Sequence, residues 1–194
     1  PTVKYSPATV IGSFYSEQSI DSGEITLKDS KGMVLKTYTD NNGIYYFDSS
    51  ELTPPFVIMG RYVSDAKSLS YYSYVNGEFA STDNVIANIS ELTSLATTLL
   101  VAKGDLGTDP ATLYAGSDES RAVLFSQDIS VGLAAIIDFI CPVVMSNEGG
   151  YSPEGCGIDE TSNFINTAYS ADPGVDDVAK LNQLLDVNIE PDNN

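Results

Sequence analysis

Few residues in this chain could do chemistry, and the most conspicuous group is the segment Asp40-Asn41-Asn42-Gly43. Oxygen-bearing side chains this close together occur both in calcium loops and in tight turns. A helix-loop-helix calcium site needs oxygen ligands at loop positions 1, 3 and 5, glycine at 6 and glutamate at 12. With Gly43 at position 6, Tyr38 and Ser49 occupy the two end positions, so both end ligands fail. The spacing predicts a turn.

A second acidic group, Asp172, Asp176 and Asp177, lies at the predicted start of a helix. Carboxylates there usually cap the helix and complement its dipole, but they are also ligands that calcium prefers. These three residues are therefore the candidate metal ligands, and no other cofactor is expected. Paired carboxylates could also hydrolyse glycosides. Among 27 acidic residues, however, some pairs lie close together by chance.

Histidine is absent from the 194 residues. Its absence excludes nucleophiles activated by histidine, imidazole zinc sites and the usual proton shuttle. Ser152, in the segment GGYSPEG, has no partner base and no nucleophile-elbow pattern around it. We therefore expect a protein that is not an enzyme.

The charge of the chain is strongly negative, with 9 lysines and arginines against 27 acids and a net charge of −18. Such a surface repels phosphate backbones and anionic lipid headgroups. Nucleic acid is therefore not an expected partner. The apolar run Ile129–Met145 is too short to span a bilayer and contains Asp138 and Pro142, so we expect no membrane insertion.

The only two cysteines, Cys141 and Cys156, flank a loop rich in glycine and proline. An even pair at this spacing predicts one disulfide, which would stabilise the fold by roughly 3 kcal/mol in the chain-entropy account. A disulfide implies an oxidising compartment. We therefore expect a secreted protein at the cell surface, starting at Pro1 after removal of a signal peptide.

Up to residue 89 the sequence is typical of short β-strands. Seven runs rich in valine, isoleucine, tyrosine and threonine are separated by turn residues: ATVIGSFY, GEITLKD, MVLKTYT, GIYYF, PFVIMGRYV, SLSYYSYV and NVIANI. Ile25 and Leu27 alternate with Thr26 and Lys28, as in a half-buried strand. The pattern predicts a small antiparallel sandwich of the immunoglobulin type over residues 1–89.

From Ser90 the hydrophobic period changes to that of a helix. Ser90 is the predicted N-cap of a first helix, and Asp109 followed by Pro110 is a strong start signal for a second. Further helical patterns follow towards the C-terminus. The fold class is therefore α+β, with a sandwich over residues 1–89 and a helical domain with the cysteine loop over residues 90–194.

The segment SGEITLKDSKGMVLKTYTDNNGIYYFDSSEL, residues 22–52, resembles the carboxypeptidase-regulatory-like, transthyretin-like modules of secreted bacterial proteins. Their pattern is a strand, a D-x-x-G hairpin, a second strand and a T-D-x-x-G-x-Y-x-F turn into a third. The resemblance implies a transthyretin-like sandwich with a helical extension, used as scaffold, adhesive stalk or accessory domain. It also implies that an isopeptide bond could join Lys28 or Lys36 to Asn84 or Asn88.

The strand SLSYYSYV raises the possibility of a protein interface. Alternation places Tyr72 and Tyr74 on one face and Tyr71 on the other, so one tyrosine row is expected at the surface. Tyrosine there suits contacts with proteins or stacking on sugars. Tyr71, Tyr72 and Tyr74 are the interface candidates, and packing within the sandwich is the alternative.

The N-terminal segment PTVKYSPATV offers a second route to association. Val3 and Tyr5 alternate with polar residues ahead of the first predicted strand. An extended arm, with Val3, Tyr5 and Val10 as its apolar residues, could add a strand to the sheet of a neighbour. Repeated head to tail, this contact yields a filament. The alternative is a disordered leader.

Together these observations predict an extracellular structural subunit that forms homo-oligomers or a surface filament, or serves as an adhesive stalk, through β-strand addition. The alternative is an accessory module of a larger surface protein that binds calcium or cell-surface glycans or proteins.

Overall fold

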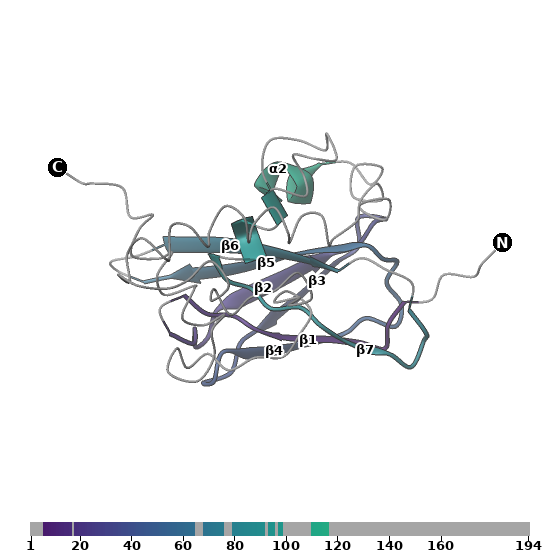
Figure 1. Cartoon of the computed structure of the whole chain (residues 1–194), viewed down its shortest axis with the longest axis horizontal. Coiled ribbons are helices and arrows are strands. Elements are labelled where there is room, and N and C mark those ends of the chain that lie inside the picture. The colour runs from purple at the N-terminus through teal and green to yellow at the C-terminus, as the bar shows by residue number, and fades with distance from the viewer. Residues whose placement is uncertain are drawn as a thin grey trace, which may run out of the picture.

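The computed structural model describes residues 6–16, 18–64, 68–75, 79–91, 93–95, 97–98 and 110–116. They form an N-terminal β-rich domain of two sheets (Figure 1). The smaller sheet has the order β4-β1-β7, with β1 at Thr9–Ser13, β4 at Ile44–Asp48 and β7 at Asn84–Ile86. The larger sheet has the order β3-β2-β5-β6, with β2 at Glu24–Lys28, β3 at Val34–Tyr38, β5 at Phe56–Val63 and β6 at Ser68–Val75.

Each of the seven predicted runs overlaps one of these strands, so the β-rich N-terminal region is confirmed. The prediction that every pair is antiparallel is wrong at one place, because β1 pairs with β7 in parallel. A parallel pair needs a long connection between its strands. Here that connection is the rest of the domain, since β1 is the first described strand and β7 the last.

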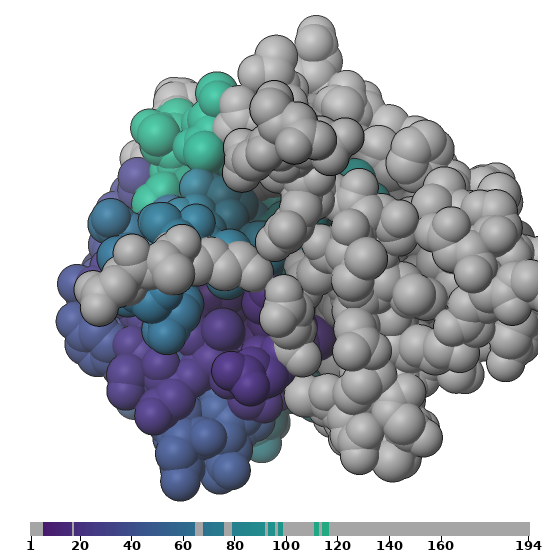
Figure 2. Space-filling model, turned by 90° about the vertical axis from the view of Figure 1, so that its left-hand side faces the viewer, coloured from purple at the N-terminus to yellow at the C-terminus, as the bar shows by residue number. Residues whose placement is uncertain are grey.

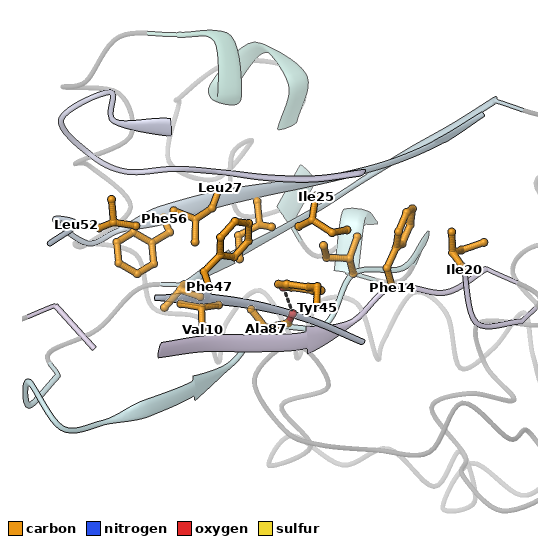
Figure 3. Packing of buried hydrophobic residues seen from close by; sticks show 13 residues of the cluster. Val10, Phe14, Ile20, Ile25, Leu27, Tyr45, Phe47, Leu52, Phe56 and Ala87 are labelled. Atoms are coloured by element: carbon orange, nitrogen blue, oxygen red, sulfur yellow. Dashed lines mark hydrogen bonds between the residues drawn. The ribbon is translucent and has the colours of Figure 1, made fainter. Parts of the chain in front are cut away.

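The two sheets enclose the hydrophobic core (Figure 3). In β4 the burial alternates strictly, so that Tyr45 and Phe47 point inwards. They meet Ile25, Leu27 and other aliphatic side chains of the opposite sheet. The Tyr45 hydroxyl donates a hydrogen bond to the Ala87 carbonyl oxygen, drawn as a dashed line in Figure 3. A buried tyrosine therefore ties β4 to the chain that follows β7.

The larger sheet is also covered on part of its outer face. Val57 and Tyr74 lie side by side on that face in the β5–β6 register, yet they are 0% and 1% exposed. The helix α2, Pro110–Ala115, packs against β5, and Lys28 in the same cross-strand row donates a hydrogen bond to the Tyr114 carbonyl oxygen at 2.9 Å. In Figure 1 α2 lies above β5 and β6, and in Figure 2 it forms a green patch on the surface.

Both predicted helix starts are confirmed. The Ser90 hydroxyl accepts the Thr93 N–H at 3.3 Å, while the Thr93 hydroxyl accepts the Ser90 N–H at 2.8 Å, so the two residues cap each other. Residues 91, 93–95 and 97–98 are helical, and α2 begins at Pro110. The remainder of the predicted helical domain, 90–194, lies outside the described residues.

Candidate functional site

The segment Asp40–Gly43 is a turn, as its spacing predicts. The Asp40 carboxylate oxygen Oδ1 accepts the N–H groups of Asn42 and Ile44, both at 2.9 Å, and Gly43 has a φ of 76°. A positive φ favours glycine. The turn does not close a hairpin of one sheet, because β3 and β4 belong to different sheets. It carries the chain from one sheet to the other, and the carboxylate oxygen Oδ1 of Asp40 is bonded to the backbone of the turn.

Asp29 plays a similar part at the neighbouring turn. It is buried, and its carboxylate accepts the N–H groups of Lys31 and Met33 at Oδ1 and of Thr53 at Oδ2, over 2.8–2.9 Å. Charge-assisted bonds of this kind compensate the burial of a carboxylate. Asp29 therefore fixes the β2–β3 turn to the loop before β5 and is a structural residue.

Strand β3 is an edge strand of the larger sheet, and the orientation of its backbone groups follows from the register. Asp29 N–H donates to the Met33 carbonyl oxygen at 3.0 Å, and Thr39 N–H donates to the Gly23 carbonyl oxygen at 2.9 Å. In an antiparallel pair, hydrogen-bonded positions alternate with positions that make no bond to the partner strand. The odd-numbered residues of β3 therefore bond to β2, and the even-numbered residues face the other way.

The even-numbered residues Val34, Lys36 and Tyr38 thus point their N–H and C=O groups away from β2. Since β3 is the last strand of its sheet, no other described strand takes up these groups. We call this set, the outward backbone groups of Val34, Lys36 and Tyr38, the open edge. Their side chains are exposed as well, at 48% for Val34 and 57% for Tyr38.

A lysine on an edge strand usually discourages pairing with a further strand. Here the Lys36 ammonium group forms an ion pair with the Glu24 carboxylate, at 2.5 Å between Nζ and Oε2, and lies 5.6 Å from the centre of the Tyr38 ring. The hydrogen bond to Glu24 raises the pKa of Lys36, against the opposing effect of desolvation. The charge of Lys36 is therefore already compensated within its own sheet, which weakens its protective effect.

The opposite edge of the same sheet, β6, is closed at Tyr72. The Tyr72 N–H donates to the Ser94 hydroxyl at 2.7 Å, and the Thr93 hydroxyl donates to the Tyr72 carbonyl oxygen at 2.8 Å. Two side chains from the start of the helix after β7 thus occupy the outward backbone groups of β6 at Tyr72.

The edge strands of the smaller sheet are β4 and β7. The outward groups of Ile44 in β4 are bonded to Asp40, whose N–H donates to the Ile44 carbonyl oxygen at 2.9 Å. Strand β7 has only three residues. Within the described part of the chain, β3 therefore presents three successive outward residues, Val34, Lys36 and Tyr38, that face no other described strand.

A depression of about 350 Å³ lies beside β3 at the margin between the two sheets. Its lining combines apolar side chains with acidic ones, and we call it the margin groove: Met33, Leu35, Asp48, Ser50, Glu51 and Leu52. Met33 is 49% exposed. Hydrogen bonds from the Ser50 hydroxyl and backbone lower the pKa of Asp48, so this carboxyl group is ionised at neutral pH.

The arm prediction is corrected at Val10. This residue is 0% exposed and lies in β1 within the core of its own domain, because the register with β4 points it inwards opposite Phe47. It is not part of an extended arm. Val3 and Tyr5 lie outside the described residues. The described chain before β1 is held at Ser49, whose N–H donates to the Ala8 carbonyl oxygen at 3.1 Å.

The tyrosine interface is corrected at Tyr74, which is 1% exposed because the outer face is covered where it lies. Burial also raises the pKa of Tyr74. Tyr71 is half-buried and packs edge-on against Phe14, with 6.3 Å between ring centres. Tyr72 is half-buried beside the closed edge. The most exposed tyrosines described are instead Tyr38 and, at 55%, Tyr46.

The predicted disulfide and the predicted metal site both involve residues that the structure does not describe. Cys141, Cys156, Asp172, Asp176 and Asp177 lie outside the described residues. Among the residues that the structure does describe, no group of acids and cysteines could hold a metal ion, and no helix is long and apolar enough to cross a membrane.

The four residues of the possible isopeptide bond have other partners. Lys28 donates to Tyr114 and Lys36 pairs with Glu24. The Asn84 side chain accepts the Thr9 hydroxyl at 2.6 Å, and the Asn88 side chain accepts the Ser13 N–H at 3.3 Å. Both lysines belong to the larger sheet, whereas both asparagine contacts are made with β1 of the smaller one.

No protein-family model, curated protein or solved structure matches this chain. The resemblance to transthyretin-like modules therefore stays a prediction, and the arrangement of two sheets is what the structure supports.

The arrangement beside β3 can bind an extended peptide through backbone hydrogen bonds, with a groove for the side chains that turn inwards. Sequence reasoning overlooked this edge. Val34, Lys36 and Tyr38 alternate with Leu35 and Thr37, which is typical of a half-buried strand but does not tell an edge strand from a central one.

Proposed function

We propose that this protein is a non-enzymatic, extracellular structural subunit with a transthyretin-like sandwich, and that it associates with further subunits by β-strand addition at the open edge of β3. In this account it builds a surface filament or an adhesive stalk. Its work is done by backbone hydrogen bonds and surface contacts, and no reactive side chain takes part.

The observation that carries the proposal is the contrast between the two edges of the larger sheet. At β6 the outward groups of Tyr72 are bonded by Ser94 and Thr93. At β3 the outward groups of Val34, Lys36 and Tyr38 face outwards beside exposed apolar side chains. Proteins usually protect such edges, since an uncovered one is a template for a further strand. Closure of β6 at Tyr72 and exposure of β3 favour a contact at β3.

The proposal is tested by the substitution Lys36→Pro. Proline removes the outward N–H of residue 36 and is tolerated on edge strands where that N–H faces solvent. The domain should therefore stay folded while association is lost. The matched control is Lys36→Thr, which removes the same charge but keeps the N–H, and it should associate at least as well as the natural chain.

Sedimentation velocity over a range of concentrations and negative-stain electron microscopy measure the outcome, with circular dichroism to monitor folding. Assemblies in the natural chain and in Lys36→Thr, together with folded monomers of Lys36→Pro, support the proposal. Equal assembly of all three chains, or monomers of all three at every concentration, would contradict it.

A further inference from the structure

The margin groove lies where a strand added to β3 would turn its inward side chains. Met33 and Leu35 line the groove, and both are odd-numbered residues whose side chains lie on the opposite side of the strand from Val34. In a strand paired to the open edge, the residues opposite Met33 and Leu35 would therefore point into the groove. The site accepts an extended peptide with two apolar side chains at alternating positions.

From this geometry we infer that the occupant is the N-terminal segment of a second copy of this chain, residues 1–5. This inference rests on the proposed function and names its partner. In the antiparallel register that places Val3 opposite Leu35 and Tyr5 opposite Met33, both apolar side chains of the segment enter the groove. Lys4 and Thr2 then face Val34 and Lys36 and exchange backbone hydrogen bonds with them.

The backbone of the segment suits this register. Pro1 would stand opposite Thr37, whose own backbone groups already bond to β2, so no hydrogen bond is required of Pro1 there. Thr2 opposite Lys36 brings no second charge to the centre of the edge. The placement therefore sets no like charges directly opposite each other, and the outward groups of Tyr38 lie beyond the end of the segment.

Charge complementarity favours the same occupant. The rim of the margin groove carries Asp48 and Glu51, and Asp48 is held in its ionised form. In a chain with a net charge of −18, the segment PTVKYSP contains one lysine and no acid. It is therefore one of the few stretches of this chain that an acidic groove attracts and does not repel.

The position of Ser6 and Pro7, which follow the segment, favours pairing of the segment with β3 of a second copy and not with β3 of its own chain. The Ser6 hydroxyl donates to the Ser49 carbonyl oxygen at 2.5 Å, and the Ser49 hydroxyl donates to the Pro7 carbonyl oxygen at 2.8 Å. The chain before β1 thus extends past the end of β4. To pair with its own β3 it would have to reverse direction, and a turn consumes most of five residues.

The matched test compares Val3→Asp with Thr2→Asp in the full chain. Both add one negative charge to the segment, but only residue 3 enters the groove. Val3→Asp should weaken association by about tenfold or more, the size expected for losing the burial of one aliphatic side chain. Thr2→Asp should change it by less than about twofold, because the charge faces solvent near Lys36. Sedimentation velocity measures both.

A disulfide trap checks the register. Chains with Tyr5→Cys are mixed with chains with Met33→Cys, whose Cα atoms should lie about 4.5 Å apart as a non-hydrogen-bonded pair. A cross-linked peptide containing residues 5 and 33, identified by mass spectrometry, is expected. The control mixture, Lys4→Cys with Met33→Cys, should give none because the two side chains lie on opposite faces.

The outcomes separate this inference from the proposed function. If Lys36→Pro abolishes association while Val3→Asp leaves it intact, strand addition at β3 stands and the N-terminal segment is overturned as the donor. A disulfide between Val34→Cys and Tyr38→Cys chains would then identify two β3 edges paired with each other. If neither Lys36→Pro nor Val3→Asp affects association, both are overturned.

Discussion

At the scale of single residues, the acidic and tyrosine side chains of the domain serve mainly to hold its backbone. The carboxylates of Asp29 and Asp40 accept hydrogen bonds from backbone N–H groups at two turns. Tyr45 crosses the core to reach the Ala87 carbonyl oxygen. Because buried polar groups need partners, these residues specify the loops and the approach of the two sheets. The residues exposed for contact with another subunit are instead those of β3, such as Val34 and Tyr38.

Burial of Tyr45 predicts a loss of stability in alkali. Burial raises the pKa of Tyr45 above the ordinary value of 10.0, so the fold favours the neutral hydroxyl. That contribution is full below pH 10 and falls as the pH rises above it, because the unfolded chain ionises first, by about 1.4 kcal/mol per pH unit. Urea unfolding at pH 9 to 11 should show a shallower decline in Tyr45→Phe than in the natural chain.

The control for this prediction is Tyr46→Phe. Tyr46 is exposed on the other face of the same strand, so its removal should leave the alkaline decline unchanged. Tyr45→Phe should also lower the free energy of unfolding at neutral pH by about 1 kcal/mol through loss of the bond to Ala87. An unchanged alkaline decline in Tyr45→Phe would contradict this account.

At the scale of elements, the two edge strands of the larger sheet differ in the contacts that their outward backbone groups make. A helix start closes β6 at Tyr72, whereas β3 carries only one ion-paired lysine. The closure depends on hydroxyl groups, since Ser94 accepts the Tyr72 N–H and Thr93 donates to the Tyr72 carbonyl oxygen. It therefore withdraws the backbone groups of Tyr72 from pairing with another strand.

Removal of both hydroxyls, in Thr93→Val with Ser94→Ala, should expose the β6 edge at Tyr72. The Tyr72 amide should then exchange its hydrogen about tenfold faster, as expected for the loss of roughly 1 to 1.5 kcal/mol of hydrogen bonding. Nuclear magnetic resonance measures this rate. Thr98→Val is the control, because the Thr98 hydroxyl donates to Ser94 within the helix. An unchanged rate in the double variant would show that another contact protects Tyr72.

The sequence predicted the strands and turns well because their signals are local. The alternation of buried and exposed residues predicts β4, and the residue types of Asp40 and Gly43 predict a turn. Strand order is not local. Nothing within MVLKTYT places β3 at an edge, and nothing within SLSYYSYV says that Tyr74 is covered from outside. The parallel pairing of β1 with β7 likewise depends on contacts between distant segments.

At the scale of the whole molecule, association has to overcome a net charge of −18. Like-charged subunits repel one another over a Debye length of about 8 Å at physiological salt. A short-range contact made by backbone hydrogen bonds and apolar side chains is consistent with such a surface. The open edge of β3, beside the compensated charge of Lys36, is a place where two such molecules can approach.

Amide hydrogen exchange at β3, measured over a range of protein concentrations, tests this claim most directly. The amides of Leu35 and Thr37 bond to β2 and should be protected at every concentration. Those of Val34 and Lys36, which face Lys4 and Thr2 in the inferred register, should exchange rapidly in the dilute monomer and become protected as the chains associate. Rapid exchange of these two amides in the associated protein would contradict the account, and so would full protection in the monomer.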